Sequence, residues 1–193
     1  MYDPLHCALF LILAFVLAGL PHSLWLNNKF SRALAIPIDG GLTFRGRRIL
    51  GENKTLRGFV VMIPAAALAF ATVAVLISFP RGVPPATLWQ LTPAGYAALG
   101  AWAGFGFMAG ELPNSFVKRQ LGILPGQAPA SGSTRTICFF IDRIDSIVGM
   151  LVAVTLAVNL PWTTWLWVLV LGPSIHLLFS WWLFRMGVKG RAA

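Results

Sequence analysis

The sequence predicts an all-α integral membrane protein with about five transmembrane helices and two cytoplasmic loops that form the functional site. Three observations support this prediction. The 193 residues are 57% hydrophobic and only 11% charged, whereas soluble domains average about 25% charged residues. Five apolar runs approach the length that a bilayer requires. Almost all basic residues lie between alternate runs, as expected for loops on one side of a membrane.

The predicted spans form a single membrane-embedded domain over residues 1–193. They cover about residues 4–26, 57–79, 94–112, 143–160 and 162–184. The first span is not interpreted as a signal peptide, because no basic stretch precedes it and no small-residue cleavage site follows it. The last two spans are separated only by the sequence NLPW, in which Pro161 prevents one continuous helix.

The basic residues also predict the orientation. Fourteen of the fifteen Lys and Arg fall in residues 27–57, 113–143 and 185–193, and only Arg81 lies on the other side. By the positive-inside rule, these segments face the cytoplasm and the N-terminus lies outside. The expected location is the cell (inner) membrane. Topology and anionic lipid headgroups explain the net charge of +9, so nucleic acid is not expected as a partner.

Two aspartates at the start of the fourth span form the first candidate site. Asp142 and Asp145, in the sequence IDRIDS, share a helix face at spacing i, i+3, with Arg143 turned away from it. Two carboxylates this close repel each other unless a cation lies between them, and Mg²⁺ binds through one or two carboxylates plus substrate phosphates. An alternative places both residues at a helix N-terminus, where the helix dipole favours each by about 0.3–1 kcal/mol.

Candidate phosphate ligands follow the third span in the sequence GELPNSFVKRQLG. If the helix continues past Pro113, then Glu111, Ser115 and Lys118 share one face, with Arg119 beside them. A kink at the proline would weaken this arrangement. In a simpler interpretation the two basic residues only set topology and extend toward the membrane interface.

The other loop, DGGLTFRGRRILGENKTLRG at residues 39–58, contains five glycines and the run Asn53-Lys54-Thr55. Glycine lets a backbone approach a ligand closely, and Lys, Arg and hydroxyl groups are common phosphate partners. The loop lacks G-x-x-x-x-G-K-[ST] and is not a Walker A motif.

Together these motifs resemble the CDP-diacylglycerol synthases, whose signature is S-x-x-K-R, then P-G, then D-R-x-D. The corresponding segments here are SFVKRQLG, LPG and IDRIDS. The 39–58 loop followed by GELPNSFVKRQLGI is similar, more specifically, to the CDP-archaeol synthase branch of small proteins with five spans. The resemblance covers roughly residues 37–59 and 110–149. The segment LPGQAPASGSTRTICFF lacks the Lys-Asp and His-Gly-Gly of the diacylglycerol enzymes.

The resemblance implies transfer of a cytidylyl group from CTP to an archaetidic- or phosphatidic-acid-like lipid phosphate, with release of pyrophosphate and with Mg²⁺ as cofactor. It implies metal ligands at Glu111, Asp142 and Asp145. It implies catalytic roles for Lys54, Lys118, Arg119, Asp142 and Asp145. The remaining motif positions are expected to bind substrate: Asp39, Arg45, Asn53, Thr55, Arg57, Ser115 and Arg143.

A CDP-alcohol phosphatidyltransferase is an alternative enzyme. Its signature begins D-G-x-x-A-R and ends G-x-x-x-D-x-x-x-D. Asp39 fits the beginning, but Thr43-Phe44 replaces Ala-Arg, and two residues instead of three separate Asp142 from Asp145.

A small membrane transporter or scaffold is the non-enzymatic alternative. Such a protein would be expected to carry charge within its spans, whereas histidines are the only acidic or basic groups in the first and fifth spans. Nucleotide binding separates the three functions. The cytidylyltransferase would bind CTP, the phosphatidyltransferase would bind a CDP-lipid, and the transporter or scaffold would bind neither. The sequence leaves open whether the lipid chains are ether-linked isoprenoid or diacyl, and it is compatible with a homodimer.

Overall fold

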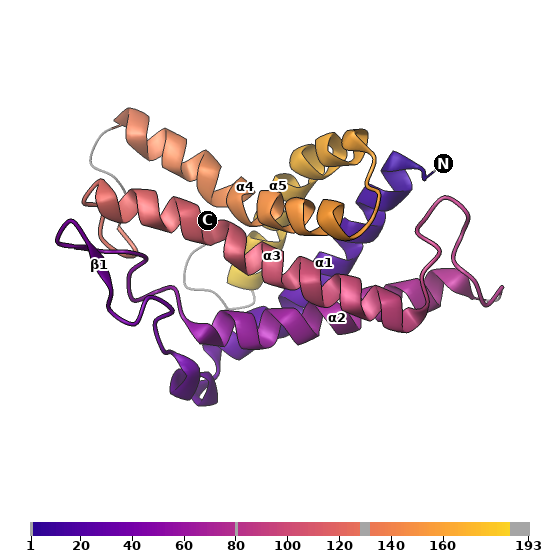
Figure 1. Ribbon diagram of the computed structural model, residues 1–193, viewed down its shortest axis with the longest axis horizontal. Helices are drawn as coiled ribbons and strands as arrows, with labels where there is room; N and C mark the ends of the chain where they lie inside the picture. The colour runs from indigo at the N-terminus through magenta and orange to yellow at the C-terminus, as the bar shows by residue number, and fades with distance from the viewer. Residues whose placement is uncertain (1, 80, 128–131, 186–193) are drawn as a thin grey trace.

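The computed structural model describes residues 2–79, 81–127 and 132–185, and these residues form five long helices. The helices are α1 Pro4–Asn27, α2 Leu56–Ser78, α3 Pro93–Gln120, α4 Gly132–Ala157 and α5 Trp162–Arg185. In Figure 1, α3 lies between α2 and α4, while α1 packs on α2 and α5 contacts both α1 and α4. The prediction of an all-helical protein is confirmed.

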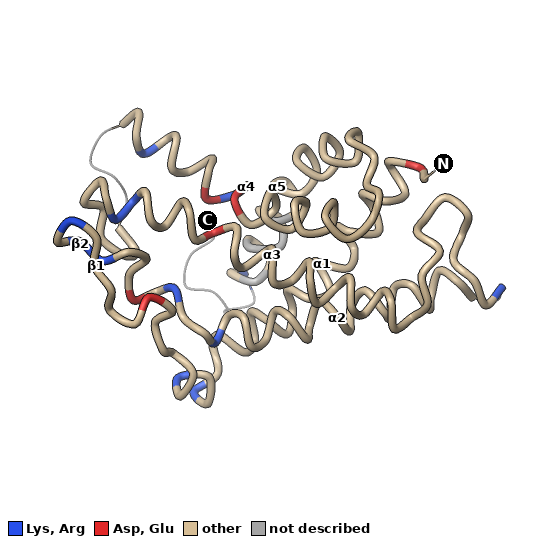
Figure 2. Tube along the Cα trace, viewed as in Figure 1, with Lys and Arg blue, Asp and Glu red and all other residues tan. Residues whose placement is uncertain are grey.

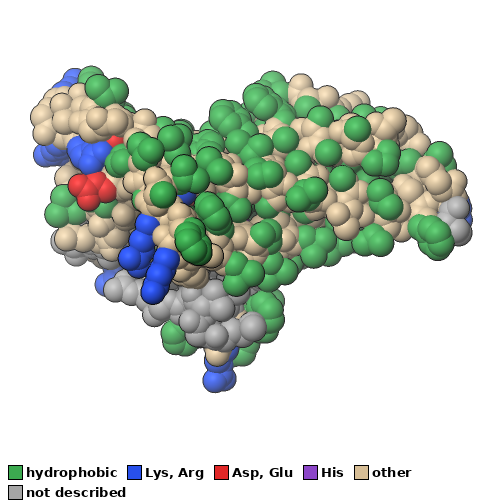
Figure 3. All heavy atoms as spheres, turned by 90° about the horizontal axis from the view of Figure 1, so that it is seen from below, with side chains coloured by type: hydrophobic (Ala, Val, Ile, Leu, Met, Phe, Trp, Pro, Cys, Tyr) green, Lys and Arg blue, Asp and Glu red, His purple; other side chains and the backbone are tan. Residues whose placement is uncertain are grey.

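The helices have the surface expected of a protein embedded in lipid. By length and composition, α1 and α2 could each cross a bilayer, and α5 contains a shorter apolar stretch, Trp162–Ile175. Figure 2 shows that charged residues gather at the end that carries the short strands β1, Thr43–Phe44, and β2, Arg47–Arg48. Figure 3 shows apolar side chains covering much of the helical surface in view. Leu68 and Leu156, for example, are 70% and 74% exposed. Exposed apolar surface of this extent suits contact with lipid. The number of spans stays a prediction.

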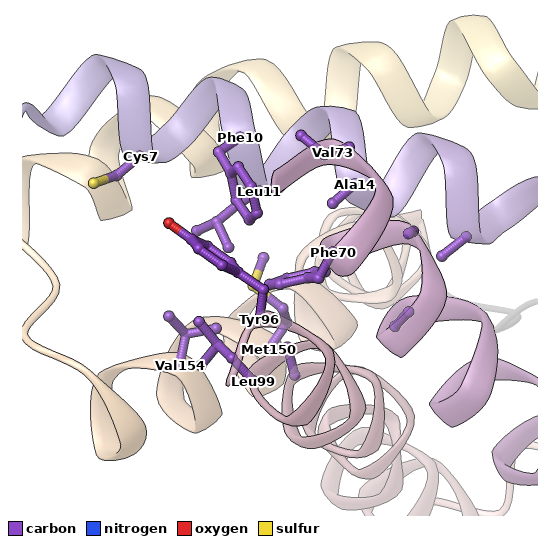
Figure 4. Close-up of a cluster of buried hydrophobic side chains, with 14 of the residues drawn as sticks. Cys7, Phe10, Leu11, Ala14, Phe70, Val73, Tyr96, Leu99, Met150 and Val154 are labelled. Atoms are coloured by element: carbon purple, nitrogen blue, oxygen red, sulfur yellow. The ribbon is translucent and has the colours of Figure 1, made fainter. Parts of the chain in front are cut away.

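The interior is an aromatic and aliphatic core, and Figure 4 shows the part of it that α1, α2, α3 and α4 contribute. Phe10 of α1, Phe70 of α2, Tyr96 of α3 and Met150 of α4 meet there. The ring of Phe10 packs edge-on against that of Phe70, with centroids 5.3 Å apart. The buried hydroxyl of Tyr96 donates to the carbonyl of Trp89 at 2.5 Å, so this polar group is satisfied inside the core.

The helices α3 and α4 approach closely because glycines face each other. A Cβ added at Gly106 would lie 2.6 Å from the carbonyl oxygen of Gly149. One added at Gly110 would lie 2.8 Å from the Cα of Gly149 and closer still to the carbonyl oxygen of Asp145. Small residues permit such backbone contact between membrane helices. This contact fixes the position of Asp145 relative to α3.

The helices α3 and α4 are longer than the predicted spans. α3 continues through Pro113 to Gln120, whereas the predicted span ended at residue 112. α4 begins at Gly132 and ends at Ala157, whereas the predicted span was 143–160. The segment predicted as the second cytoplasmic loop is therefore largely helical. A search for apolar runs missed these parts because their polar residues interrupt the hydrophobic stretch.

Because α4 begins at Gly132, the helix dipole does not explain why two aspartates occur at residues 142 and 145. Asp142 and Asp145 lie well inside α4, about three turns after Gly132. No acidic residue occupies the first turn described for this helix, and the dipole acts mainly within that turn. The two charges need another source of stabilisation.

Residues 28–55 form the connection between α1 and α2. It contains the 3₁₀ helix η1, Lys29–Leu34, and a short antiparallel hairpin of β1, Thr43–Phe44, with β2, Arg47–Arg48. Arg45 and Gly46 form the turn with φ of 51° and 75°. Positive φ at both central residues is the hairpin geometry that matches strand twist.

The two ends of this connection pair with each other beside the first turn of α2. The N–H of Ile38 donates to the carbonyl of Lys54, and the N–H of Leu56 donates to the carbonyl of Ile36, both at 2.9 Å. The pairing anchors Lys54 one residue before the N-cap Thr55. The side chain of Lys54 can therefore reach α3.

Candidate functional site

A polar cavity of about 620 Å³ lies at the charged end of the molecule, between the 28–55 connection, α3 and α4. Nine of the predicted site residues line it: Asn53, Lys54, Glu111, Ser115, Lys118, Arg119, Asp142, Arg143 and Asp145. Because α3 continues past Pro113, its site residues lie on one face as the spacing predicted. The two long motifs, far apart in the sequence, meet in this one cavity.

An amide group joins the two aspartates. The Nδ2 atom of Asn114 donates to Oδ1 of Asp142 at 2.6 Å and to Oδ2 of Asp145 at 2.7 Å. The ammonium of Lys118, one turn further along α3, pairs with the same oxygen of Asp142. These donors stabilise two carboxylates that would otherwise repel each other.

Glu111 holds a different set of partners. Its Oε2 forms an ion pair with Lys54, and its Oε1 accepts a hydrogen bond of 2.8 Å from the hydroxyl of Ser146. The same hydroxyl lies 3.3 Å from Oδ1 of Asp145. Ser146 is buried and thus connects Glu111 on α3 to the aspartate pair on α4.

No pattern in the sequence pointed to Asn114 or Ser146. Asn114 was part of the quoted motif, and its i, i+4 spacing to Lys118 places both on the face toward Asp142. Ser146 follows Asp145 directly. Their connection of the carboxylates becomes visible only when α3 and α4 are packed against each other.

Arg119 lies against the loop backbone. Its guanidinium would lie 3.2 Å from a Cβ at Gly51, where φ is +91° and only glycine is unstrained. Burial lowers the pKa of Arg119, but an arginine remains charged. Its Nε atom has no hydrogen-bond partner among the described residues. This leaves a donor available to a ligand.

Asp39 lies outside the cavity lining and organises the loop. Its carboxylate accepts hydrogen bonds from Arg48 and from the backbone N–H groups of Gly41, Leu50 and Gly51. Burial by itself would raise the pKa of Asp39, but these four donors outweigh it and hold the pKa well below its usual range. Asp39 therefore fixes the glycine-rich turn that contacts Arg119.

Three further predicted substrate-binding residues also fall outside the lining. Arg45 is exposed at the hairpin turn, with its guanidinium 5.3 Å from the ring centroid of Phe44. Thr55 is the buried N-cap of α2, and Arg57 lies in the first turn of that helix. The structure thus does not place these side chains in the wall of the cavity.

The aspartate pair has a donor set suited to a hard cation. Two carboxylates one turn apart match the one or two carboxylates through which Mg²⁺ binds when substrate phosphates supply other ligands. No group of three or more His, Cys, Asp or Glu side chains gathers around a common point in the part of the chain that the structure describes. Glu111 forms an ion pair with Lys54 and accepts a hydrogen bond from Ser146, and its part as a third metal ligand stays a prediction.

A second, apolar cavity of about 300 Å³ adjoins the polar one. Its walls are mainly aliphatic and aromatic side chains of α1, α4 and α5, but Glu111, Asp142 and Arg143 line both cavities. A third space of about 680 Å³ runs along α3 and α4 from Trp102 to Asp145. The charged site therefore borders apolar spaces large enough for parts of lipid chains.

The polar cavity is rich in cations and carboxylates and adjoins an apolar cavity between apolar helices. This combination is typical of membrane-embedded enzymes that act on the phosphate of a lipid. Comparison with known proteins gives the particular family. The family described as CarS-like, CDP-archaeol synthase, matches residues 8–192. The chain belongs to the CDP-archaeol synthase family, as the sequence motifs predicted. Enzymes of this family are nucleotidyltransferases that generally depend on a metal.

Individual relatives agree with this assignment. CDP-archaeol synthase of Halobacterium salinarum is 33% identical over 162 residues, which are 79% of this chain and 81% of the relative. The Thermofilum pendens enzyme of the same name is 32% identical over 155 residues, but the match spans only 64% of its length. A solved intramembrane enzyme for archaeal membrane lipid biosynthesis shares the fold, with a TM-score of 0.55 and 24% identity over 84% of this chain and 90% of that one.

Proposed function

We propose that this protein transfers a cytidylyl group from CTP to the phosphate of a membrane lipid, giving a CDP-lipid and pyrophosphate. Membership in the CDP-archaeol synthase family supports this activity. The structural observation that carries the proposal is the junction of the two cavities at Glu111, Asp142 and Arg143. A water-soluble triphosphate in the polar cavity and a lipid in the apolar one would meet there.

The proposed reaction is an in-line substitution at phosphorus. An oxygen of the lipid phosphate forms a bond to the α-phosphorus of CTP, and the bond from that phosphorus to the oxygen bridging to the β-phosphate breaks. Pyrophosphate leaves with that bridging oxygen. The nucleophile is already an anion, so the protein needs no residue to remove a proton from it. Catalysis then depends on positioning and on stabilisation of charge.

The cationic side chains of the cavity would bind the triphosphate. Lys54 and Lys118 each have three N–H donors, so each can keep its carboxylate partner and still donate to a phosphate oxygen. Arg119 offers its unpartnered Nε and the rest of its planar fork. Asn53 and Ser115 add polar contacts from the loop and from α3.

Asp142 and Asp145, with Asn114 between them, would hold the divalent cation, which we propose is Mg²⁺. When bound, the ion supplies neutralisation of phosphate charge. Asn114 keeps the two carboxylates at a fixed separation, and Ser146 connects them to Glu111. We assign Glu111 chiefly to placing Lys54, with which it forms an ion pair.

The acceptor lipid we propose is an ether-linked isoprenoid glycerol phosphate, since the similar curated proteins are CDP-archaeol synthases. Purified protein in neutral detergent, labelled CTP and Mg²⁺ would be incubated with a dialkylglycerol phosphate, a diacylglycerol phosphate or neither. Labelled CDP-lipid that forms only with a lipid phosphate is expected, and preferentially with the ether lipid. Label transfer from a CDP-lipid but not from CTP would favour the phosphatidyltransferase, and binding of neither nucleotide would favour a transporter or scaffold.

We also propose that the polar cavity faces the cytoplasm. The basic residues around it support this orientation by the positive-inside rule. Native Cys7 and Cys138 are buried, so a single added cysteine can report on each side. A cysteine at exposed Glu52 should resist an impermeant thiol reagent in intact cells, while one at exposed Val83 should react. Reaction of the first and protection of the second would reverse the orientation.

A further inference from the structure

A histidine of the first helix lies at the polar end of the apolar cavity. His22 on α1 lines this cavity together with Glu111, Asp142 and Arg143. Its neighbours in the chain are mainly apolar. The structure places its side chain in the wall of a space that Glu111 and Asp142 also line.

The side chain of His22 has an unsatisfied polar atom. Its Nε2 is buried and has no hydrogen-bond partner among the described residues. It lies near the start of α2, about 4.0 Å from where a Cβ would be at Gly58. A buried polar group without a partner carries a desolvation cost, and such groups usually have a partner that a structure does not include.

Arg143, which lines the same cavity, also has a buried nitrogen atom without a hydrogen-bond partner among the described residues. Its guanidinium stacks on the ring of Phe139 at 3.3 Å and donates through Nη1 to the carbonyl of Phe139 at 2.8 Å, but its buried Nε has no partner among the described residues. The lining of one cavity thus includes two side chains, His22 and Arg143, that each have a nitrogen atom without a partner among the described residues. Guanidinium and imidazole groups suit the oxygens of a phosphate monoester.

Among the described residues, the third space, along α3 and α4, has no cationic side chain that could bind a phosphate. Among the residues that line it, from Trp102 to Asp145, there is no Lys, Arg or His. A phosphate entering that way would meet the carboxylate of Asp145 first. A lipid tail can occupy such an apolar groove, but the headgroup charge favours the cavity of His22 and Arg143.

We propose that His22 binds the phosphate of the acceptor lipid together with Arg143 in the apolar cavity, whereas the triphosphate-binding lysines line the polar cavity. This inference deepens the proposed function, on which it rests, by assigning each substrate to its own cavity. The tails of the acceptor would extend along α1 and α5, past Phe15 and Val168. The nucleophilic phosphate would then approach the cavity junction from the membrane side.

The test is a set of histidine variants assayed for each substrate separately. His22→Leu should raise the KM for a dialkylglycerol phosphate about tenfold, the effect of one lost charge-assisted hydrogen bond, and should leave the KM for CTP unchanged. His22→Gln, whose amide can reach the place of Nε2, should restore most of the lipid affinity. His6→Leu is the matched control, because His6 lies at the other end of α1 beside Asp3.

Lipid binding without CTP separates this inference from the proposed function. Native mass spectrometry would compare binding of the same dialkylglycerol phosphate to the wild type, to His22→Leu and to His22→Gln. Weaker binding by the Leu variant alone supports the assignment even if no turnover is seen. Equal binding by all three, or an equal rise in the KM for CTP and for lipid in a folded Leu variant, would overturn it. Absence of CDP-lipid formation by the wild type would instead count against the proposed function.

Discussion

The side-chain amide of Asn114 lies 2.7 Å from Asp145 and donates a second hydrogen bond, of 2.6 Å, to Asp142. One residue of α3 thus joins two carboxylates of α4 that a metal ion would also need to join. Groups that orient metal ligands commonly affect metal affinity by about 10–100-fold. The amide is therefore as informative about the metal site as the carboxylates themselves.

Replacement of Asn114 by Leu should weaken metal binding. The variant removes the donor that fixes the carboxylates while keeping a similar side-chain size, and we expect Mn²⁺ affinity to fall about 10–100-fold. Electron paramagnetic resonance of free Mn²⁺ measures this without nucleotide or turnover. Asn159→Leu, in the exposed turn between α4 and α5, is the control. Equal Mn²⁺ affinity in both variants would show that Asn114 has no part in the site.

The ion pair of Lys54 with Glu111 leads to a second prediction. Lys54→Ala removes a phosphate donor held in place by α3, and kcat/KM for CTP should fall by about 1.5–3 kcal/mol of transition-state stabilisation. Lys29→Ala is the matched control, because exposed Lys29 lies in the same connection and contributes the same charge to topology. If both variants have wild-type kinetics, Lys54 serves only to orient the chain in the membrane.

The glycine contact between α3 and α4 leads to a third prediction. A methyl group at Gly110 would press on the backbone of Gly149 and on the carbonyl of Asp145, and overpacking of this kind costs about 1–3 kcal/mol. Gly110→Ala should lower both the melting temperature and the turnover, because it moves Asp145 away from Asn114. Gly132→Ala, where a Cβ meets nothing within 4 Å, should do neither. A Gly110→Ala protein with normal turnover would mean that this helix spacing is not critical.

The sequence predicted much of this site but not its internal connections. Motif residues such as Glu111, Ser115 and Lys118 were predicted to share a face because helical periodicity is local, and this holds once α3 passes Pro113. The helix α4 begins well before the predicted span because its polar first half does not register as an apolar run. Asn114, Ser146 and His22 were missed as site residues because their roles arise from contacts between helices, which no spacing within one segment reveals.

Asp39 gives a prediction about pH. Its pKa in the folded loop is held below the ordinary value by Arg48 and three backbone N–H groups, so the carboxylate stabilises the loop fully above the ordinary carboxyl pKa of about 4. That stabilisation should be lost as the pH falls from there toward the depressed folded value. Hydrogen exchange of Leu50 and Gly51, whose N–H groups bond to Asp39, should report the loosening.

Substitution of Asp39 by Asn should produce the loosened loop at neutral pH and remove its dependence on pH in the acidic range. The amide has one acceptor oxygen in place of two and carries no charge to pair with Arg48. Glu52→Gln is the control, since Glu52 is largely exposed and lies 3.4 Å from Arg48. Unchanged exchange of Leu50 and Gly51 in Asp39→Asn would mean that the hairpin and glycines hold the loop by themselves.

The aspartate pair gives the last prediction. Asp142→Asn and Asp145→Asn each keep the side-chain shape but remove one of the two carboxylate charges. The apparent Mg²⁺ requirement should rise, and turnover should fall by about two orders of magnitude, on the order of 3 kcal/mol of transition-state stabilisation. Because both residues and Asn114 form one hydrogen-bonded unit, the double variant should be scarcely worse than the worse single one.

Measurements of melting temperature and of Mg²⁺-dependent CTP turnover on the three proteins distinguish a metal site from a structural pair. Removing one of two facing carboxylates relieves repulsion, so stability should change little or rise. A purely structural pair would show additive losses in melting temperature with turnover and Mg²⁺ dependence untouched. Normal turnover in Asp145→Asn would refute the metal assignment, because Asp145 is the carboxylate that α3 holds through both Asn114 and the close backbone contact at Gly110.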